Sequence, residues 1–570
     1  MRLISFLFAF ALTLNAYSQS YPKDYFRPPL DIPLYLSGTF GELRSNHFHS
    51  GIDIKTQGVQ GKKVYAIADG YVSRIKISEG SYGKALYITH PNGYVSVYGH
   101  LQKFNDTLQK FVIELQYKRE SFVVQSFPDK ERFKVKKGDV IALSGNSGGS
   151  MGPHLHFEIR EEATQYPVNP LLFESINVKD FTRPKISGFA IYPVDEYSTI
   201  NGKNDTVFYE VAGWGPNCRL KDKPEIIVNG NVDFGIKTHD LMNEISNRNG
   251  VYEISLFMDT MQVFGIKMDK LSFSTTRYIN SLIDYRHYKE DKSRFVRTRI
   301  DTNNRLFIYH NVEGNGIYNF NDTLMHSIEF VVNDAYGNVS NLKFDLRSTD
   351  SVIFHKQKSK DSMRHFDYSR KNTIEEAGVK VSFSANSFYR SFNFEFNTSD
   401  GGEENISKIY QLHNQFVPVQ KSFTVAIKPD SSYNELFSKV FVAYSSDGKE
   451  YWYVGAKKSD NFISAKTKLL GYYTLMADTL APEIKPINIK EGKNIAKQKT
   501  IRIKIKDEQT VISSYNAYLN DEWILMEYDA KNELLVYNYN QYLKKGKNNF
   551  RLEVEDAMKN KSEYSVTLFY

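Results

Sequence analysis

The chain has 570 residues, more than one hydrophobic core usually organises, so we expect three to five domains. A hydrophobic content of 41% fits an ordinary soluble globular protein. The formal net charge of +7 is spread along the chain without a basic run, and no basic patch is interleaved with aromatic residues, so the sequence argues against a nucleic-acid partner.

The choice of residues favours strands and turns over helices. The chain contains 39 Tyr and 39 Phe, together with many Val, Ile, Thr and Asn residues. Aromatic and β-branched side chains fit a pleated surface, and Asn favours turns. We therefore predict a mostly β protein.

The first 18 residues have the pattern of a signal peptide. Met1 and Arg2 give a short basic start, residues 3–14 are mainly apolar, and Ala16 and Ser18 are small residues at a cleavage site. The alternative is a membrane anchor, but twelve helical residues rise only about 18 Å against a hydrocarbon core of about 30 Å. We expect cleavage after Ser18 and an exported, periplasmic or secreted protein without a transmembrane anchor in its mature form.

The only cysteine is Cys218. It therefore excludes an intramolecular disulfide, and it lies far from the signal sequence, where a lipid anchor would need it.

Short strands with sharp turns dominate the next part of the chain. Residues 19–35 are rich in proline and aromatics and predict an extended lead-in, followed by an antiparallel β-sheet or sandwich domain over residues 36–175. Pro91, Asn92 and Gly93 indicate a hairpin turn. The predicted strands are 63–69, 71–77, 86–90, 94–98, 140–143 and 155–160.

One stretch of this domain has helical spacing instead. Leu108, Phe111, Val112 and Leu115 recur at intervals of three and four within residues 104–120. We predict a short amphipathic helix inside an insertion at about 102–133.

The rest of the chain predicts three β-rich modules. Residues 331–340 resemble residues 552–562, and each segment lies late in a stretch that opens with a proline, Pro184 or Pro482, and a strand. These stretches, 181–350 and 481–570, predict two sandwich-like, immunoglobulin-like modules. Residues 351–480 also alternate as strands do and predict a further β-rich module between them.

A pair of histidines stands out after a glycine-rich loop. On a strand, His154, His156, Glu158 and Arg160 share one face, while apolar residues occupy the other. Two histidines at alternate positions suit a metal site, although a solvated polar face is the simpler alternative.

Two further segments offer histidines. His49 and Asp53 would lie about 13 Å apart on a straight strand, so sharing an ion requires a bend near Gly51. His100 ends the predicted hairpin strand that contains Tyr98, and by itself it fits a surface histidine. Neither segment alone identifies a metal site.

Taken together, these motifs resemble the lysostaphin-like (LytM-type) zinc metallopeptidases, which are bacterial wall hydrolases. The resemblance covers about residues 36–175 and includes the intervening blocks 64–72, 93–101 and 137–145. It implies one Zn²⁺ per peptidase domain, with two residues that act on a bound water and the transition state. The implied zinc ligands are His49, Asp53 and His156, and the implied catalytic pair is His154 and His100.

Other histidines and the glycine-rich loop receive lesser roles. His47 lacks the spacing to Gly51 and Asp53, so we treat it as peripheral, and we expect a structural role for His90 beside the hairpin turn. The loop 144–152 predicts a mobile wall of the groove, or simply a tight connection. The insertion is longer than the usual connection of the family and bears on substrate specificity.

The resulting functional hypothesis is a zinc-dependent endopeptidase. It would cleave the stem peptides or cross-bridges of peptidoglycan through attack by a metal-bound water, with histidine as the base. One alternative is a catalytically silent, wall-binding regulator of another hydrolase. Another is a zinc peptidase that acts on a protein substrate. The C-terminal β modules offer a surface for a protein regulator.

Overall fold

The computed structural model describes residues 21–351, 363–376, 378–430 and 436–570, so the predicted signal peptide lies outside the described residues. The described chain is mostly β, which confirms the predicted fold class. We name four parts after their sheets and cores: the first region (21–178), the second (179–351), the third (363–478) and the fourth (479–570). The domain boundaries themselves stay a prediction.

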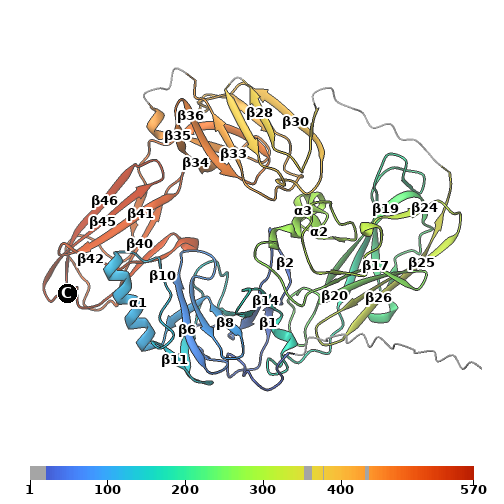
Figure 1. Cartoon of the computed structure of the whole chain (residues 1–570). Helices are drawn as coiled ribbons and strands as arrows, with labels where there is room; N and C mark the ends of the chain where they lie inside the picture. Colours follow the sequence, from blue (N-terminus) through green and yellow to red (C-terminus); the bar gives the residue numbers. More distant parts are fainter. Residues whose placement is uncertain (1–20, 352–362, 377, 431–435) are drawn as a thin grey trace, which may run out of the picture.

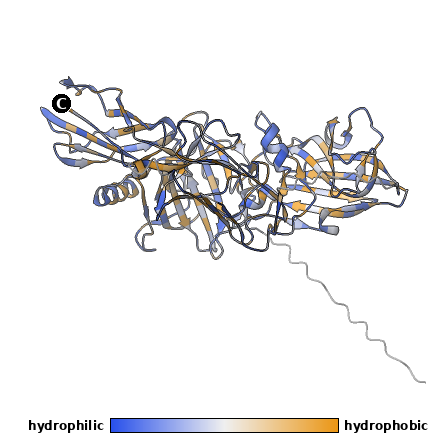
Figure 2. Cartoon of the chain, turned by 90° about the horizontal axis from the view of Figure 1, so that it is seen from above, coloured by the Kyte–Doolittle hydropathy of each residue, from blue (hydrophilic) through white to orange (hydrophobic). Residues whose placement is uncertain are grey.

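The four regions follow one another around a closed circuit (Figure 1). The first region lies at the lower left, the second at the right, the third at the top, and the fourth returns to helix α1 of the first (Figure 1). Seen from above, hydrophobic segments run along the strands of the regions (Figure 2). This distribution follows from strand alternation, which turns every second side chain toward a core.

The main sheet of the first region is antiparallel. The long strands of this sheet match the predicted strands closely. The strand predicted over 63–69 is shorter, ends at Tyr65 and belongs to a second, smaller sheet. In order across the sheet, the strands are β1 (Leu36–Gly38), β4 (Ile52–Lys55), β13 (His154–Glu161), β8 (Tyr94–Gly99), β7 (Lys84–Thr89), β6 (Gly70–Ile77) and β10 (Val124–Ser126), with β11 (Lys134–Val135) beside β6 and β14 (Pro167–Val168) beside β13.

A smaller sheet and a hairpin complete this region. The lead-in packs onto the same core through buried Phe26, Leu30 and Leu34. The additional strands are β5 (Lys63–Tyr65), β12 (Val140–Ser144) and β9 (Leu101–Phe104) in the smaller sheet, and β2 (Leu43–Arg44) and β3 (His47–Phe48) in the hairpin.

The predicted helix of the insertion is present as α1 (Asp106–Arg119). The side chain of Asn105 caps its first turn by accepting a hydrogen bond from the backbone N–H of Leu108. Leu108 and Val112 are buried against the core of the first region, as their helical spacing predicts.

The second region is built on one large sheet with two short helices. In order, its strands are β18 (Arg219–Leu220), β17 (Val207–Ala212), β15 (Lys185–Pro193), β19 (Ile227–His239), β26 (Val339–Ser348), β25 (Met325–Asn333), β20 (Glu253–Met258), β21 (Met261–Lys267) and β23 (Tyr309–His310). Three short strands also pair with β19, namely β16 (Thr199–Ile200), β22 (Val296–Arg297) and β24 (Tyr318–Phe320), and the helices are α2 (Ile279–Leu282) and α3 (Tyr285–Asp291).

The third and fourth regions each contain two sheets around one core. In the third region, the strands of one sheet are, in order, β27 (Met363–Phe366), β30 (Phe392–Ser399), β31 (Ile409–Leu412), β37 (Gly471–Ala477), β33 (Val440–Ser445) and β34 (Trp452–Gly455). The strands of its other sheet are β28 (Asn372–Glu376), β29 (Val379–Phe383), β32 (Phe423–Ile427), β36 (Phe462–Thr467) and β35 (Lys457–Ser459). In the fourth region, the strands of one sheet are, in order, β38 (Glu483–Pro486), β40 (Thr500–Lys506), β44 (Leu534–Asn538) and β43 (Glu527–Asp529). The strands of its other sheet are β39 (Lys493–Asn494), β46 (Lys561–Phe569), β45 (Lys547–Asp556), β41 (Ile512–Leu519) and β42 (Glu522–Ile524).

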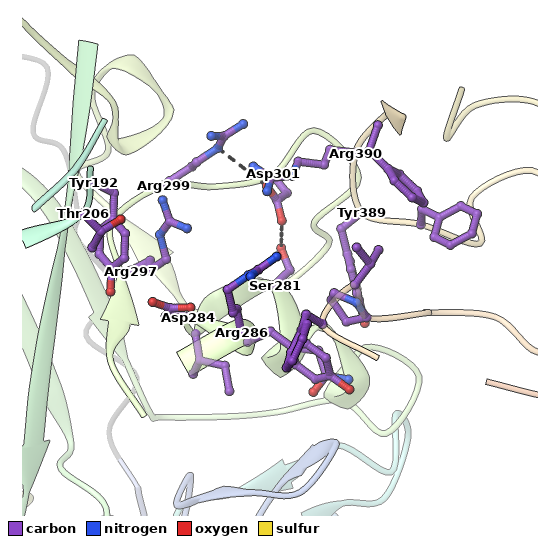
Figure 3. A pocket seen from close by; sticks show the side chains of 18 residues that line it. Tyr192, Thr206, Ser281, Asp284, Arg286, Arg297, Arg299, Asp301, Tyr389 and Arg390 are labelled. Carbon is purple, nitrogen blue, oxygen red and sulfur yellow. Dashed lines mark hydrogen bonds and ion pairs between the residues drawn. The ribbon is translucent and has the colours of Figure 1, made fainter. Parts of the chain in front are cut away.

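Specific contacts join neighbouring regions. The second and third meet at an arginine-rich pocket of about 310 Å³, where Arg297 and Arg299 of the second region lie near Arg390 of the third (Figure 3). The fourth meets the first at α1, where the ring of Tyr117 stacks on Tyr542 and packs edge-on against Trp523. Within the described residues, no helix has the length and apolar character needed to cross a membrane.

Candidate metal centre and active site

Strand pairing brings the predicted ligands together. His156 on β13 stands directly opposite Asp53 on β4, and cross-strand neighbours have Cβ atoms about 5 Å apart. His49 reaches the same point because the chain bends at Gly51 before β4 begins. A Cβ atom on Gly51 would lie 2.3 Å from the carbonyl oxygen of Phe157, so only glycine fits at this bend.

The three side chains converge through one atom each. His49 Nε2 lies 3.1 Å from Asp53 Oδ1 and 3.1 Å from His156 Nδ1. His156 Nδ1 lies 2.9 Å from the same Asp53 oxygen. All three residues are buried, with 3–4% of their surface exposed.

Neighbouring acceptors fix the tautomers of these rings. The Nδ1–H of His49 donates to the carbonyl oxygen of Thr39 at 2.8 Å, which leaves the lone pair on Nε2. The Nε2–H of His156 donates to Glu158 at 2.8 Å, which leaves the lone pair on Nδ1. Both lone pairs therefore point toward Oδ1 of Asp53, and a cation between these three atoms would be coordinated by the two nitrogens and the oxygen.

The predicted catalytic pair lies beside this centre. His154 Nε2 is 3.4 Å from Asp53 Oδ1, and the ring centroid of His100 lies 4.7 Å from that of His154 and 5.9 Å from that of His156. His100 follows β8 in the left-handed conformation, with φ of 57°, which turns it away from the path of a continuing strand.

Backbone carbonyls also fix the tautomers of this pair. The Nδ1–H of His154 donates to Gly152 at 2.9 Å, and the Nδ1–H of His100 donates to Ser147 at 2.8 Å. Each ring keeps Nε2 free to accept a proton. Burial, together with His156 and His154, lowers the pKa of His100 to about 3, so this ring is neutral at physiological pH.

Four residues around the centre were not assigned a role from the sequence. Arg44 donates to the second carboxylate oxygen of Asp53 at 2.7 Å, and the ring of Tyr82 stacks on His156 with centroids 4.9 Å apart. Tyr82 donates to Glu158 at 2.5 Å, and Arg160 pairs with that carboxylate. Glu158 and Arg160 share the predicted face of β13, whereas nothing in the local pattern marks Arg44 or Tyr82, which come from separate elements.

These neighbours keep both carboxylates ionised. Burial alone would raise the pKa of Asp53, but the neighbouring His49, His154 and His156 hold it well below its usual value. Burial acts in the same direction on Glu158, and Arg160 and His156 hold its pKa low. Burial would lower the pKa of His156, but Asp53 and Glu158 raise it to about 9, so the position beside its Nδ1 favours a positive charge, which is either a proton on Nδ1 or a cation that replaces it.

The donor set fits a zinc ion better than a hard cation. Two imidazole nitrogens and one carboxylate oxygen are common zinc ligands, and ligands of a tetrahedral site lie about 3.3 Å apart. The three donors are 2.9–3.1 Å apart. Only three protein ligands converge among the described residues, which leaves a fourth position for water or substrate.

The remaining predictions for this region have different outcomes. His47 is exposed and donates to Ser45, outside the cluster. His90 is buried between the carbonyl of Asp69 and the hydroxyl of Ser96, which agrees with a structural role. The insertion contributes α1, which packs on the core of the first region and contacts the fourth region through Tyr117.

The glycine-rich loop is held from outside the first region. Lys531 of the fourth region donates to the carbonyl oxygens of Asn146 and Ser150. Lys84, on β7, forms an ion pair with Glu527 of the fourth region at 2.8 Å. The fourth region therefore contacts the loop that carries the acceptors for His100 and His154.

Two family models match the chain. Residues 47–114 and 123–170 match peptidase family M23, and residues 363–478 match a Zu5-like domain. The M23 match covers the converging histidines and is interrupted within the insertion. The Zu5-like match coincides with the third region.

Several known proteins are similar over this part. An uncharacterized metalloprotease of Haemophilus influenzae is 32% identical over 28% of this chain and 29% of its own length. The DD-carboxypeptidase/endopeptidase Mpg of Neisseria meningitidis is 33% identical over 23% of each chain. The murein hydrolase activator NlpD of Escherichia coli is 33% identical over 24% of this chain and 28% of its own. The chain thus spans less than a third of the length of each relative.

A solved structure covers the same part. The catalytic domain of the M23 protein EnpA from Enterococcus faecalis is 25% identical and matches 25% of this chain and 95% of its own, with a TM-score of 0.19. The match of residues 47–114 and 123–170 to peptidase family M23 confirms the predicted resemblance to the lysostaphin-like (LytM-type) metallopeptidases, and this match lies within the first region.

Proposed function

We propose that the first region is a zinc-dependent endopeptidase that hydrolyses peptide bonds in the stem peptides or cross-bridges of peptidoglycan. The observation that carries this proposal is the convergence of His49, Asp53 and His156 with both imidazole tautomers fixed by neighbouring acceptors. His49, Asp53 and His156 would hold one Zn²⁺. When bound, zinc lowers the pKa of a water molecule and polarises a carbonyl group.

The other two histidines supply proton transfer. His154 holds its proton on Nδ1 and presents Nε2 toward the centre, so it accepts a proton from a water molecule that attacks the peptide carbonyl. His100 presents Nε2 beside it, so it can receive the proton that His154 takes from the water and then donate a hydrogen bond to the oxygen that gains negative charge. The hydrogen bonds to Gly152 and Ser147 keep both rings oriented through these steps.

The substrate follows from the relatives and from the proposed location. The name of Mpg describes a DD-carboxypeptidase/endopeptidase, and that of NlpD an activator of the hydrolysis of murein, which is peptidoglycan. Together they support peptides of peptidoglycan as the substrate. Export through the proposed signal peptide would bring the mature chain to the periplasm or the exterior, where that polymer lies. The second to fourth regions would then contact the wall or a protein regulator.

The test is release of soluble muropeptides from purified sacculi by residues 19–570. His156→Ala is the inactive variant, and His47→Ala is its matched control because His47 is exposed and outside the cluster. We expect release by the wild type and by His47→Ala, loss in His156→Ala and with a chelator, and recovery of the wild type with zinc. Mass analysis of the products names the bond.

One relative supports a second candidate, a silent activator of another hydrolase, because NlpD carries that description. A zinc-loaded chain that releases nothing from sacculi by itself, but accelerates release by an added murein hydrolase, would replace the proposal with this one. Cleavage of an unfolded protein but not of sacculi would indicate a protein substrate instead.

A further inference from the structure

Three aspartates meet where the second region faces the first. Asp180 ends the segment that joins the two regions, Asp240 directly follows β19, and Asp334 directly follows β25. Each offers a carboxylate oxygen, and these oxygens all lie within 4.8 Å of one another. Two ligands of a calcium ion, each about 2.4 Å from it, lie at most about 4.8 Å apart, so one ion can reach all three oxygens.

Two of the oxygens in this cluster are buried without a partner. Asp180, Asp240 and Asp334 are 4%, 2% and 3% exposed. Asp180 Oδ2 and Asp240 Oδ1 have no hydrogen-bond partner, although unsatisfied buried carboxylate oxygens are costly. Across the described residues, no Lys, Arg or His forms an ion pair with any of the three.

The pKa values of two of these aspartates also show that the cluster lacks a positive charge. Burial, reinforced by Asp334 and Asp180, raises the pKa of Asp240 to about 9. Burial and the charge of Asp334 raise the pKa of Asp180 to about 6, against the hydrogen bond from the backbone N–H of Thr182. A divalent cation would remove the conflict among the three carboxylates.

The fourth region contains a related cluster that provides an internal comparison. Asp478, Asp507 and Asp556 also come within 4.8 Å of one another. Asn560 donates to Asp556 and to the carbonyl of Asp478, just as Asn338 donates to Asp334 and to the carbonyl of Asp180. The repeated segments noted in the sequence thus make the same hydrogen bonds.

The two clusters differ at one decisive oxygen. The hydroxyl of Thr510 donates to Asp478 Oδ2 at 2.8 Å, whereas the corresponding Oδ2 of Asp180 has no partner. The fourth-region cluster therefore satisfies the carboxylate of Asp478 within the protein. The cluster of the second region leaves two oxygens for a ligand from solution.

We propose that Asp180, Asp240 and Asp334 bind one calcium ion that fastens the second region to the first. The all-oxygen, carboxylate-rich donor set suits a hard cation, and Ca²⁺ tolerates the irregular geometry of three separate segments better than Mg²⁺ does. Asn249 stands opposite Asp240 in an antiparallel bridge, is 3% exposed and has both amide atoms unpartnered, so it is a further buried polar group beside Asp240.

The proposed ion would act on the junction because the segments beside it pack on the core of the first region. Met242, two residues after Asp240, belongs to that core, and Tyr336, two residues after Asp334, packs against it. Asn338 also donates to the carbonyl oxygen of Asp180 at 3.2 Å. Holding the three carboxylates together therefore holds the peptidase domain against the second region.

The experiment measures calcium binding by zinc-saturated residues 19–570, so that the histidine centre is already filled. Equilibrium dialysis with ⁴⁵Ca²⁺ gives the affinity, and thermal unfolding gives the shift in Tm on adding calcium. The variants are Asp240→Asn, with Asp180→Asn as a second test, and the matched control is Asp507→Asn in the related cluster.

We expect calcium binding and a rise in Tm for the wild type and for Asp507→Asn. Asp240→Asn and Asp180→Asn should each weaken binding at least tenfold and remove the rise in Tm. Without calcium, Asp240→Asn should melt at a higher temperature than the wild type, because it removes the cost of keeping this buried carboxyl group protonated. A variant that melts lower would be recognised as misfolded.

Three results would overturn the proposal. One is no binding at about 10 mM calcium, above the range in which extracellular calcium modules bind. Another is unchanged binding in Asp240→Asn, which would locate the ion elsewhere. The last is a larger rise in Tm with magnesium than with calcium. None of these readouts uses peptidase activity, so they are independent of the proposed function.

Discussion

The first and second regions each bury a cluster of acidic side chains, but they compensate its charge differently. In the first region, Asp53 is held by Arg44 and three histidines, and both carboxylate oxygens have partners. In the second, Asp180 and Asp240 each keep a buried oxygen without one. The comparison teaches that mixed nitrogen and oxygen donors with fixed tautomers suit a borderline metal such as zinc, whereas a cluster of carboxylates alone either holds a proton or suits a hard cation.

The largest expected effect separates the roles of the two histidines on β13. In His154→Ala, zinc content should remain near that of the wild type while the rate of muropeptide release falls by about 10²–10⁴-fold, because a proton acceptor is lost and no ligand is. Zinc analysis beside the sacculus assay measures both. Loss of zinc together with activity would instead assign His154 to the metal, and His47→Ala serves as the unaffected control.

A smaller effect should follow from removing the acceptor that orients His156. Glu158→Gln replaces the carboxylate that receives the Nε2–H of His156, and loss of such a partner usually weakens metal affinity about 10–100-fold. Competition with a chromophoric chelator gives the affinity. Glu161→Gln, on the same strand but paired with Lys270, is the matched control, and equal affinities in both variants would contradict this role for Glu158.

The acidic cluster should reveal itself through pH in calcium-free protein. The folded state raises the pKa of Asp240 to about 9, so its stabilising contribution is complete below about pH 4 and is lost as the pH rises toward 9. Between pH 5 and 7 the wild type should lose up to about 2.7 kcal/mol more stability than Asp240→Asn. Chemical denaturation measures the difference. A difference that persists in saturating calcium would argue against the ion.

The smallest expected effect concerns the contact between the fourth region and the glycine-rich loop. Lys531→Ala removes hydrogen bonds to Asn146 and Ser150, and partly exposed contacts of this kind contribute about 0–1 kcal/mol. Global stability should hardly change, while amide exchange of residues 145–151 should accelerate. Lys545→Ala, at an exposed lysine of the same region outside this contact, is the control. Unchanged exchange in Lys531→Ala would show that the loop is fixed by its own turns.

Most of the first region followed from local pattern. Alternation on β13, the hairpin at residues 91–93 and the spacing of α1 were all evident in the sequence, because each depends on neighbours within a few residues. The assignment of zinc ligands depended on resemblance to a family, since spacing alone did not show the bend at Gly51. The roles of these residues, the domain boundaries and the signal peptide stay predictions.

The sequence by itself determined the mostly β class, the polar face of β13 and the two related segments at 331–340 and 552–562. Only the tertiary structure decided that Arg44 and Tyr82 surround the histidines, that the fourth region returns to the loop 144–152, and that one acidic cluster is satisfied while its relative is not. The physical reason is that period and turn chemistry are local, whereas charge compensation and hydrogen-bond satisfaction depend on residues far apart in the chain.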